Sequence, residues 1–164
     1  MKNIFKPLYS IIVIALLLTA VACDSSKNIT AASEAVSGAI DSSKWKFTAT
    51  DVMPQYGTSR PADLNYDVSF SNNKLVVYLP YYGKADGGAN ILSGKSPLDF
   101  TSTDFTMDKQ KGRKGQWIIT IKPNDYREVQ SMIFTFYSSG SANLSISMTH
   151  RTAISFGGNV EPLK

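Results

Sequence analysis

From Trp45 onward, apolar and polar residues alternate with a period of two, and this pattern constrains the fold more than any other feature of the chain. Side chains of a β-strand point alternately to the two faces of a sheet, so the alternation predicts strands with one buried face. Residues 64–70 alternate in this way, and residues 75–79 follow as a partner run. Ser71-Asn72-Asn73-Lys74 lie between them and favour a tight turn, so the two runs predict a β-hairpin.

Two more hairpins are predicted further along the chain. Residues 104–110 face residues 116–122 across a Gly-containing turn, and residues 132–138 face residues 142–149 across positions 139–141. Residues 154–156 add a last short strand. Successive hairpins at this spacing indicate an antiparallel meander, folded as a small sandwich or a partly closed barrel. The sequence leaves these two closures open.

One short amphipathic helix is predicted before the strands, over residues 30–42. Ile29, Ala32, Val36 and Ile40 recur there at helical spacing. The apolar face of this helix is expected to cover an open end or a face of the sheet. The expected fold class is therefore all-β, with one short N-terminal helix.

The first 22 residues have the organisation of a secretory signal. Lys2 and Lys6 precede an apolar stretch over residues 8–22, which ends in small residues ahead of Cys23. A membrane-spanning helix needs about 20 apolar residues, and this stretch is shorter. Export is therefore the expected role of this segment.

Cys23 is the single cysteine of the chain, so it can form no internal disulfide. The residues before it, at 19–22, resemble a lipobox, although Ala20 stands where that motif usually has Leu. We expect cleavage before Cys23 and lipid attachment to its thiol. The alternative is a plain signal peptide that is cut after Ala22.

This interpretation divides the chain into a signal peptide (1–22), a lipidated cysteine with a short tether (23–28) and one β domain with its helix (29–164). The expected partner is a membrane, bound through lipid on Cys23. Residues 24–27 lack the dense acidic run that resembles surface-export signals, which favours a periplasm-facing outer-membrane anchor in the cell envelope.

The charge of the chain argues against nucleic acid as a partner. Loss of Lys2 and Lys6 with the signal peptide lowers the formal net charge from +4 to +2. A nearly neutral domain lacks the electrostatic footprint of a general nucleic-acid binder.

Few residues are suited to catalysis. The chain has one histidine, His150, and none of the common nucleophile, zinc or phosphate-binding motifs, so we expect no cofactor, no metal and no catalytic set. An envelope hydrolase that works from carboxylates or from His150 remains an alternative. The carboxylates considered for it are Asp86, Asp99, Asp104 and Asp108. Asp104 and Asp108 are expected on one solvated strand face.

A basic turn lies between the strands of the second hairpin. Its cations are Lys109, Lys111, Arg113 and Lys114. They could attract anionic headgroups or polysaccharide phosphates. The favoured interpretation is a solvated hairpin tip that deters association of sheet edges.

Aromatic residues concentrate around Pro80, which is expected to end a strand. Tyr78, Tyr81, Tyr82 and Lys84 lie there, followed by a Gly-rich segment up to Gly94. Tyrosine combines an apolar ring with a hydroxyl group and suits sugars, peptides or lipid tails. These four residues form the predicted ligand-binding site, for a small molecule, a glycan or an envelope protein. The alternatives are that the rings cover the core, or that the protein is purely structural.

Several ordered segments from Trp45 to Glu161 resemble a family of small bacterial lipoproteins known as domain of unknown function 4251. The segments that carry the resemblance are Trp45 to Ala49, Leu79 to Lys84, Gly87-Gly88, the Gly-rich turn at 111–115 before Trp117-Ile118-Ile119, Gly140 to Leu144, and His150 to Gly158. The chain departs from the family pattern at His150, Ala153 and Phe156, where Asn, Pro and Tyr are usual. The resemblance implies an all-β fold and a lipoprotein or secreted location, with no activity to carry over.

Overall fold

The structure is a computed structural model that describes residues 24–63, 65–86 and 95–163. Its elements are helix α2 (Asp24–Asp41), strands β1 (Trp45–Pro54), β2 (Arg60–Pro61), β3 (Asp67–Ser71), β4 (Lys74–Tyr78), β5 (Asp99–Ser102), β6 (Phe105–Lys111), the short 3-10 helix η1 (Arg113–Gly115), β7 (Trp117–Pro123), β8 (Val129–Phe136), β9 (Ser141–Met148) and β10 (Ile154–Pro162).

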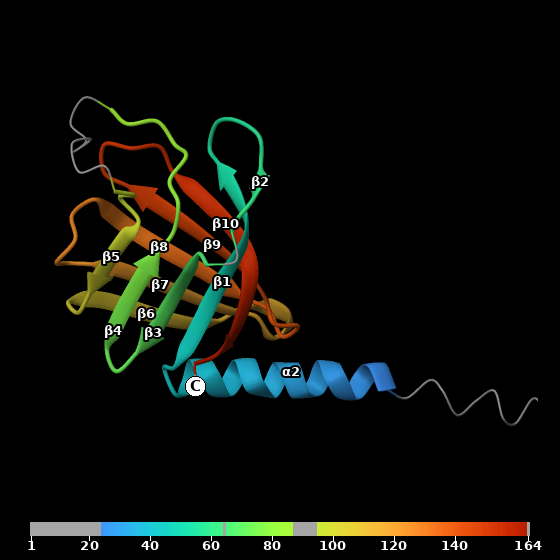
Figure 1. The fold of residues 1–164 in the computed structure, drawn as a ribbon. Helices are drawn as coiled ribbons and strands as arrows, with labels where there is room; N and C mark the ends of the chain where they lie inside the picture. Colours follow the sequence, from blue (N-terminus) through green and yellow to red (C-terminus); the bar gives the residue numbers. More distant parts are fainter. Residues whose placement is uncertain (1–23, 64, 87–94, 164) are drawn as a thin grey trace, which may run out of the picture. The chain divides into compact units, whose positions relative to one another are not determined.

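The strands form one antiparallel sheet in the order β5-β4-β3-β1-β10-β9-β8-β7-β6, with β2 added beside β1 (Figure 1). Two runs of consecutive strands, β3 to β5 and β6 to β10, meet through the long pairing of β1 with β10. The sheet curves into a nearly closed barrel that leaves β5 and β6 at the ends of the strand order. The predicted all-β class with one N-terminal helix is confirmed, and the closure is barrel-like.

The predicted hairpins are present. Asn72 and Asn73 join β3 to β4 with φ values of 51° and 55°, which a two-residue turn of type I′ requires at both positions. The 3-10 helix η1 joins β6 to β7, and Gly140, with φ of 87°, lies at the turn between β8 and β9. Leu64, which began the first predicted strand, lies outside the described residues.

Helix α2 begins at Asp24, six residues before the predicted start, so the segment assigned to a tether is helical from there. Val36, Ala39 and Ile40 of this helix are buried in the core of the β domain. Cys23 lies outside the described residues.

The core fills the interior of the curved sheet with large aromatic and aliphatic side chains. Trp45 is fully buried there, stacked on Phe70 at 5.5 Å between ring centroids and edge-on to Phe134 and Phe136. Aromatic pairs at such distances add to the hydrophobic gain of burial. These contacts join β1, β3 and β8, so the core couples both runs of strands.

Two residues, Asp125 and Lys109, form hydrogen bonds between elements near the ends of the strand order. Asp125, after β7, accepts hydrogen bonds from the Ser102 hydroxyl at 2.6 Å and from the Thr103 and Asp104 N–H groups at 2.9 and 3.1 Å, which fastens the β5–β6 turn. The Nζ of Lys109 in β6 donates to the Ile40 carbonyl, near the end of α2, at 2.9 Å. The sheet is thus braced at both β5 and β6.

Candidate ligand-binding site

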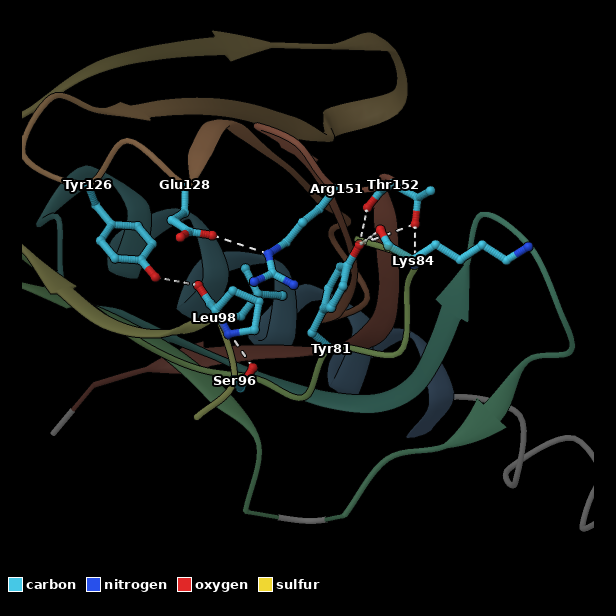
Figure 2. A network of polar contacts seen from close by, with 9 residues as sticks. Tyr81, Lys84, Ser96, Leu98, Tyr126, Glu128, Arg151 and Thr152 are labelled. Carbon is cyan, nitrogen blue, oxygen red and sulfur yellow. Dashed lines mark hydrogen bonds and ion pairs between the residues drawn. The ribbon is translucent and has the colours of Figure 1, made fainter. Parts of the chain in front are cut away.

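Tyr81 is fixed by its hydroxyl group, which points toward a turn far away in the sequence. The hydroxyl donates toward the Thr152 carbonyl at 2.9 Å and the Lys84 carbonyl at 3.1 Å, and lies 3.2 Å from the Thr152 hydroxyl (Figure 2). A Cβ atom at Gly83 would collide with the Tyr81 hydroxyl and the Thr152 side chain, so a glycine is needed there. The half-buried Tyr81 ring packs against the core.

The segment that carries Tyr81 also pairs with the turn between β9 and β10. Two hydrogen bonds join Lys84 and Thr152. The Thr152 N–H donates to the Lys84 carbonyl at 3.0 Å, and the Lys84 N–H donates to the Thr152 hydroxyl at 3.0 Å. Ala85 forms a β-bridge with Arg151, and the Asp86 N–H donates to the His150 carbonyl at 2.8 Å. Residues 81–86 are therefore held as an extra extended strip.

A buried cation supports this strip from within. The side chain of Arg151 is only 8% exposed, and its Nε lies 3.2 Å from a carboxylate oxygen of Glu128. Its guanidinium carbon lies 5.5 Å from the centre of the Tyr81 ring, and Figure 2 shows the two side chains beside each other. A buried charge is tolerated when it is paired and hydrogen-bonded. Arg151 thus links Tyr81 to the start of β8.

Tyr126 extends the same network to the residues before β5. Its hydroxyl donates to the Pro97 carbonyl at 2.8 Å, and its ring stacks on Phe100 at 4.1 Å. Burial raises the pKa of Tyr126 above 10.0, and the nearby Glu128 carboxylate raises it further. The phenol therefore stays a neutral donor at physiological pH.

Four further tyrosines form an exposed surface around this braced strip, together with two cations. We call it the tyrosine surface; its members are Tyr56, Tyr66, Tyr78, Tyr82, Arg60 and Lys84. The exposed fractions of Tyr56, Tyr78 and Tyr82 are 63%, 47% and 44%. Large exposed rings in such number are unusual, because burial of apolar area away from water lowers the free energy.

Ring contacts hold the tyrosine surface together. The rings of Tyr66 and Tyr78 lie 5.4 Å apart, and the Arg60 guanidinium lies 4.7 Å above the Tyr82 ring. Partial burial raises the pKa of Tyr66, and the Tyr82 and Tyr78 hydroxyl groups raise it further.

Lys84 and Tyr56 add the other end of the surface. The Lys84 Nζ lies 5.8 Å from the centre of the Tyr56 ring, within the range of a cation–π contact. Both side chains are exposed. A ligand that covers the surface would therefore meet aromatic faces and positively charged donors together.

The four predicted ligand-binding residues divide into two groups. Tyr78, Tyr82 and Lys84 are exposed on the tyrosine surface, whereas the Tyr81 hydroxyl is turned inward to Thr152. Sequence reasoning did not single out Tyr56, Tyr66 and Arg60, which come from segments before β2, before β3 and in β2. The signal in the sequence that could have indicated them is an aromatic or Arg residue next to the end of a strand.

The residues considered for catalysis have different surroundings. Asp108 is exposed on β6, as predicted, and accepts from Gln110 at 2.6 Å, whereas Asp104 lies in the turn before β6 and accepts from Asn124 at 2.8 Å. His150 is exposed in the turn after β9 with a positive φ of 56°. Within residues 24–63, 65–86 and 95–163, no group of three or more His, Cys, Asp or Glu residues is suited to hold a metal ion.

The cations of the basic turn have different surroundings, which the sequence does not indicate. Lys109 does not belong to the hairpin tip, because its Nζ binds the Ile40 carbonyl and the Ser43 hydroxyl at 2.9 and 2.7 Å. The Lys111 Nζ lies 4.7 Å above the Trp117 ring, and Arg113 is exposed. The Lys114 side chain lies outside the described part.

Together, the fold and the site define a small all-β domain with a nearly closed sheet, one helix and an exposed aromatic surface. The chain belongs to the family described as domain of unknown function (DUF4251), whose model matches residues 27–160. The family resemblance of the sequence is thereby confirmed.

A solved structure gives the same fold. The crystal structure of a DUF4251 family protein from Bacteroides eggerthii is similar with a TM-score of 0.58 and 12% sequence identity, covering 81% of this chain and 89% of that chain. No curated protein matches this chain. None of the described helices is both long and apolar enough to cross a membrane.

Proposed function

We propose that this protein is an exported lipoprotein whose β domain is a non-enzymatic binding module. The observation that carries the binding role is the tyrosine surface, in which three rings between 44% and 63% exposed lie around a hydrogen-bonded strip. Tyrosines supply a large contact area at low conformational entropy cost, because each has only two side-chain torsions.

The contacts beneath the surface favour binding for a second reason. Tyr82 and Lys84 lie on the strip that Thr152 and Arg151 hold in place. A surface that is ordered before binding loses less entropy when a ligand arrives. The inward hydroxyl of Tyr81 thus supports the binding surface, while Tyr78 and Tyr82 contact the ligand.

Affinity capture tests the binding role. The native protein and a Tyr78→Ala/Tyr82→Ala variant are used to capture material from envelope extracts, which is identified by mass spectrometry. We expect specific small molecules, glycans or proteins to be lost with the variant. Tyr137→Ala is the matched control, because Tyr137 is an exposed tyrosine on the segment after β8. Equal recovery with all three proteins would contradict a binding role for this surface.

The anchor is the second part of the proposal. Cleavage before Cys23 and acylation of its thiol would hold the domain at the periplasmic face of the outer membrane, since several acyl chains anchor a protein stably. The support is the order of basic residues, apolar stretch and small residues before Cys23. Metabolic labelling with an alkyne fatty acid tests it: the native chain should be labelled and fractionate with the outer membrane. A Cys23→Ser variant should lose the label, and equal labelling of both would overturn the assignment.

A further inference from the structure

A row of polar side chains crosses four strands next to the exposed tyrosines. Pairing places Asp67 of β3 opposite Tyr78 of β4, and Tyr78 opposite Asp99 of β5. Thr48 of β1 is opposite Asp67 and continues the row. Figure 1 shows β5, β4, β3 and β1 side by side.

The row faces outward. Along β3, β4 and β5 the neighbours of these residues, such as Val68, Val77 and Phe100, are buried, so Asp67, Tyr78 and Asp99 lie on the opposite face. Residues directly opposite one another on paired strands have Cβ atoms about 5 Å apart. Tyr78 therefore stands between two carboxylates, with the Tyr66 ring 5.4 Å from its own.

The charges around the row balance. Asp67 and Asp99 lie in the row, and Lys46 lies beside Asp67. Arg60, Lys84 and Asp63 lie at the neighbouring tyrosines, against Tyr82, Tyr56 and the Tyr66 backbone. Lys46 and Asp67 form an ion pair at 3.1 Å, and Asp63 lies close enough to Tyr66 to raise the pKa of that phenol, after burial, Tyr82 and Tyr78. A balanced surface produces no strong field of one sign, so it does not select an ion by long-range attraction.

Aromatic faces beside carboxylate acceptors match one ligand chemistry. Ionised carboxylates only accept hydrogen bonds, and tyrosine hydroxyls both donate and accept. A neutral sugar presents hydroxyl donors at its edge and a C–H face that packs on an aromatic ring. Building on the binding role proposed above, we propose that the ligand is an uncharged oligosaccharide that lies across Tyr78 and Tyr82 and donates hydroxyl groups to Asp67 and Asp99.

The test uses the purified full chain and neutral linear oligosaccharides of about six units (gluco-, manno- and galacto-series), with oligogalacturonate as the anionic comparison. We expect calorimetric binding of at least one neutral series, with less than a twofold change between low and high salt because no ion pair is formed. Tyr78→Ala should weaken it about tenfold or more. Tyr137→Ala should leave it unchanged.

Asp99 supplies the sharper comparison. Asp99→Asn keeps a carbonyl acceptor and should retain most of the affinity, whereas Asp99→Leu should lose it about tenfold. Binding of oligogalacturonate alone, a steep salt dependence, or no neutral binding at all would overturn the sugar assignment. If Tyr78→Ala/Tyr82→Ala still abolishes capture of an envelope protein, only the ligand class is wrong; if capture is unaffected as well, the binding role is also wrong.

Discussion

The Tyr81 hydroxyl donates to the carbonyl oxygen of Thr152, 71 positions along the chain, at 2.9 Å. This contact closes the strip of residues 81–86 onto the turn before β10. It links a residue beside the tyrosine surface to the sheet that supports the surface. The backbone that carries Tyr82 and Lys84 is therefore held in part by the side chain of their neighbour Tyr81.

Tyr81→Phe is expected to lower the free energy of unfolding by about 1 kcal/mol, because the carbonyls of Thr152 and Lys84 lose a donor in a half-buried place. Hydrogen exchange should also accelerate at the Lys84 and Thr152 N–H groups. Tyr82→Phe is the control, since Tyr82 is exposed, and should leave stability and exchange unchanged. Equal effects of the two changes would contradict the brace.

The sequence could not tell which neighbouring tyrosine turns inward. The sequence placed Tyr81 and Tyr82 together in one predicted ligand-binding site. The choice between them is made by Thr152 and Arg151, which the fold brings from the other end of the chain. Local pattern carries no information about such a partner, so the predicted site combined one supporting residue with three surface residues.

Asp125 should make stability depend on acidic pH. Hydrogen bonds from the Ser102 hydroxyl and from the Thr103 and Asp104 N–H groups lower the pKa of Asp125 below 3.8. The unfolded chain then binds more protons than the folded one between the two pKa values, so the stabilisation is present above about pH 4 and is lost as pH falls through the folded pKa.

Chemical unfolding between neutral and strongly acidic pH measures this effect. Asp125→Asn should be less stable than the native chain near neutrality, and the difference should shrink as pH falls. Asp108→Asn is the matched control, because Asp108 is an exposed carboxylate with a single side-chain contact to Gln110. A stability difference for Asp125→Asn that does not vary with pH would contradict a stabilising role of the Asp125 carboxylate.

Gly158 lies in β10 where the chain passes close to the backbone of β1. A Cβ atom there would collide with the Thr48 carbonyl oxygen and touch the Phe47 ring, and neither can move without disturbing the pairing. Gly158→Ala should therefore lower the free energy of unfolding by about 2–3 kcal/mol. Gly38→Ala, in α2 with nothing within 4 Å of the new Cβ, should raise it by about 0.5–1 kcal/mol. Thermal unfolding of both variants checks the pair.

Hairpins were predictable because their signals are local, while closure of the sheet was not. The Asn72-Asn73 turn and the alternation around it lie within a dozen residues. The pairing of β1 with β10 joins residues such as Phe47 and Val160 across most of the chain. The short strands β2 and β5 were not predicted, because two to four residues are too few to show the alternation of apolar and polar residues.

Lys109 of the basic turn has two oxygen partners at the end of α2 that fix its direction. Alternation along β6 already puts it on the face of Phe105 and Met107, toward the sheet interior. There its Nζ reaches the Ile40 carbonyl, near the C-terminal end of α2, and the Ser43 hydroxyl. A cation at a helix C-terminus satisfies free carbonyls and opposes the negative end of the helix dipole.

Lys109→Met keeps the aliphatic stem of the side chain and removes the charge and its donors. It should lower the free energy of unfolding by about 1–2 kcal/mol and speed hydrogen exchange in the last turn of α2. Lys122→Met, an exposed cation on neighbouring β7, should change neither quantity. If both substitutions cost the same, the loss reflects net charge alone. A loss confined to Lys109→Met, together with faster hydrogen exchange in the last turn of α2, indicates that this contact joins β6 to the end of α2.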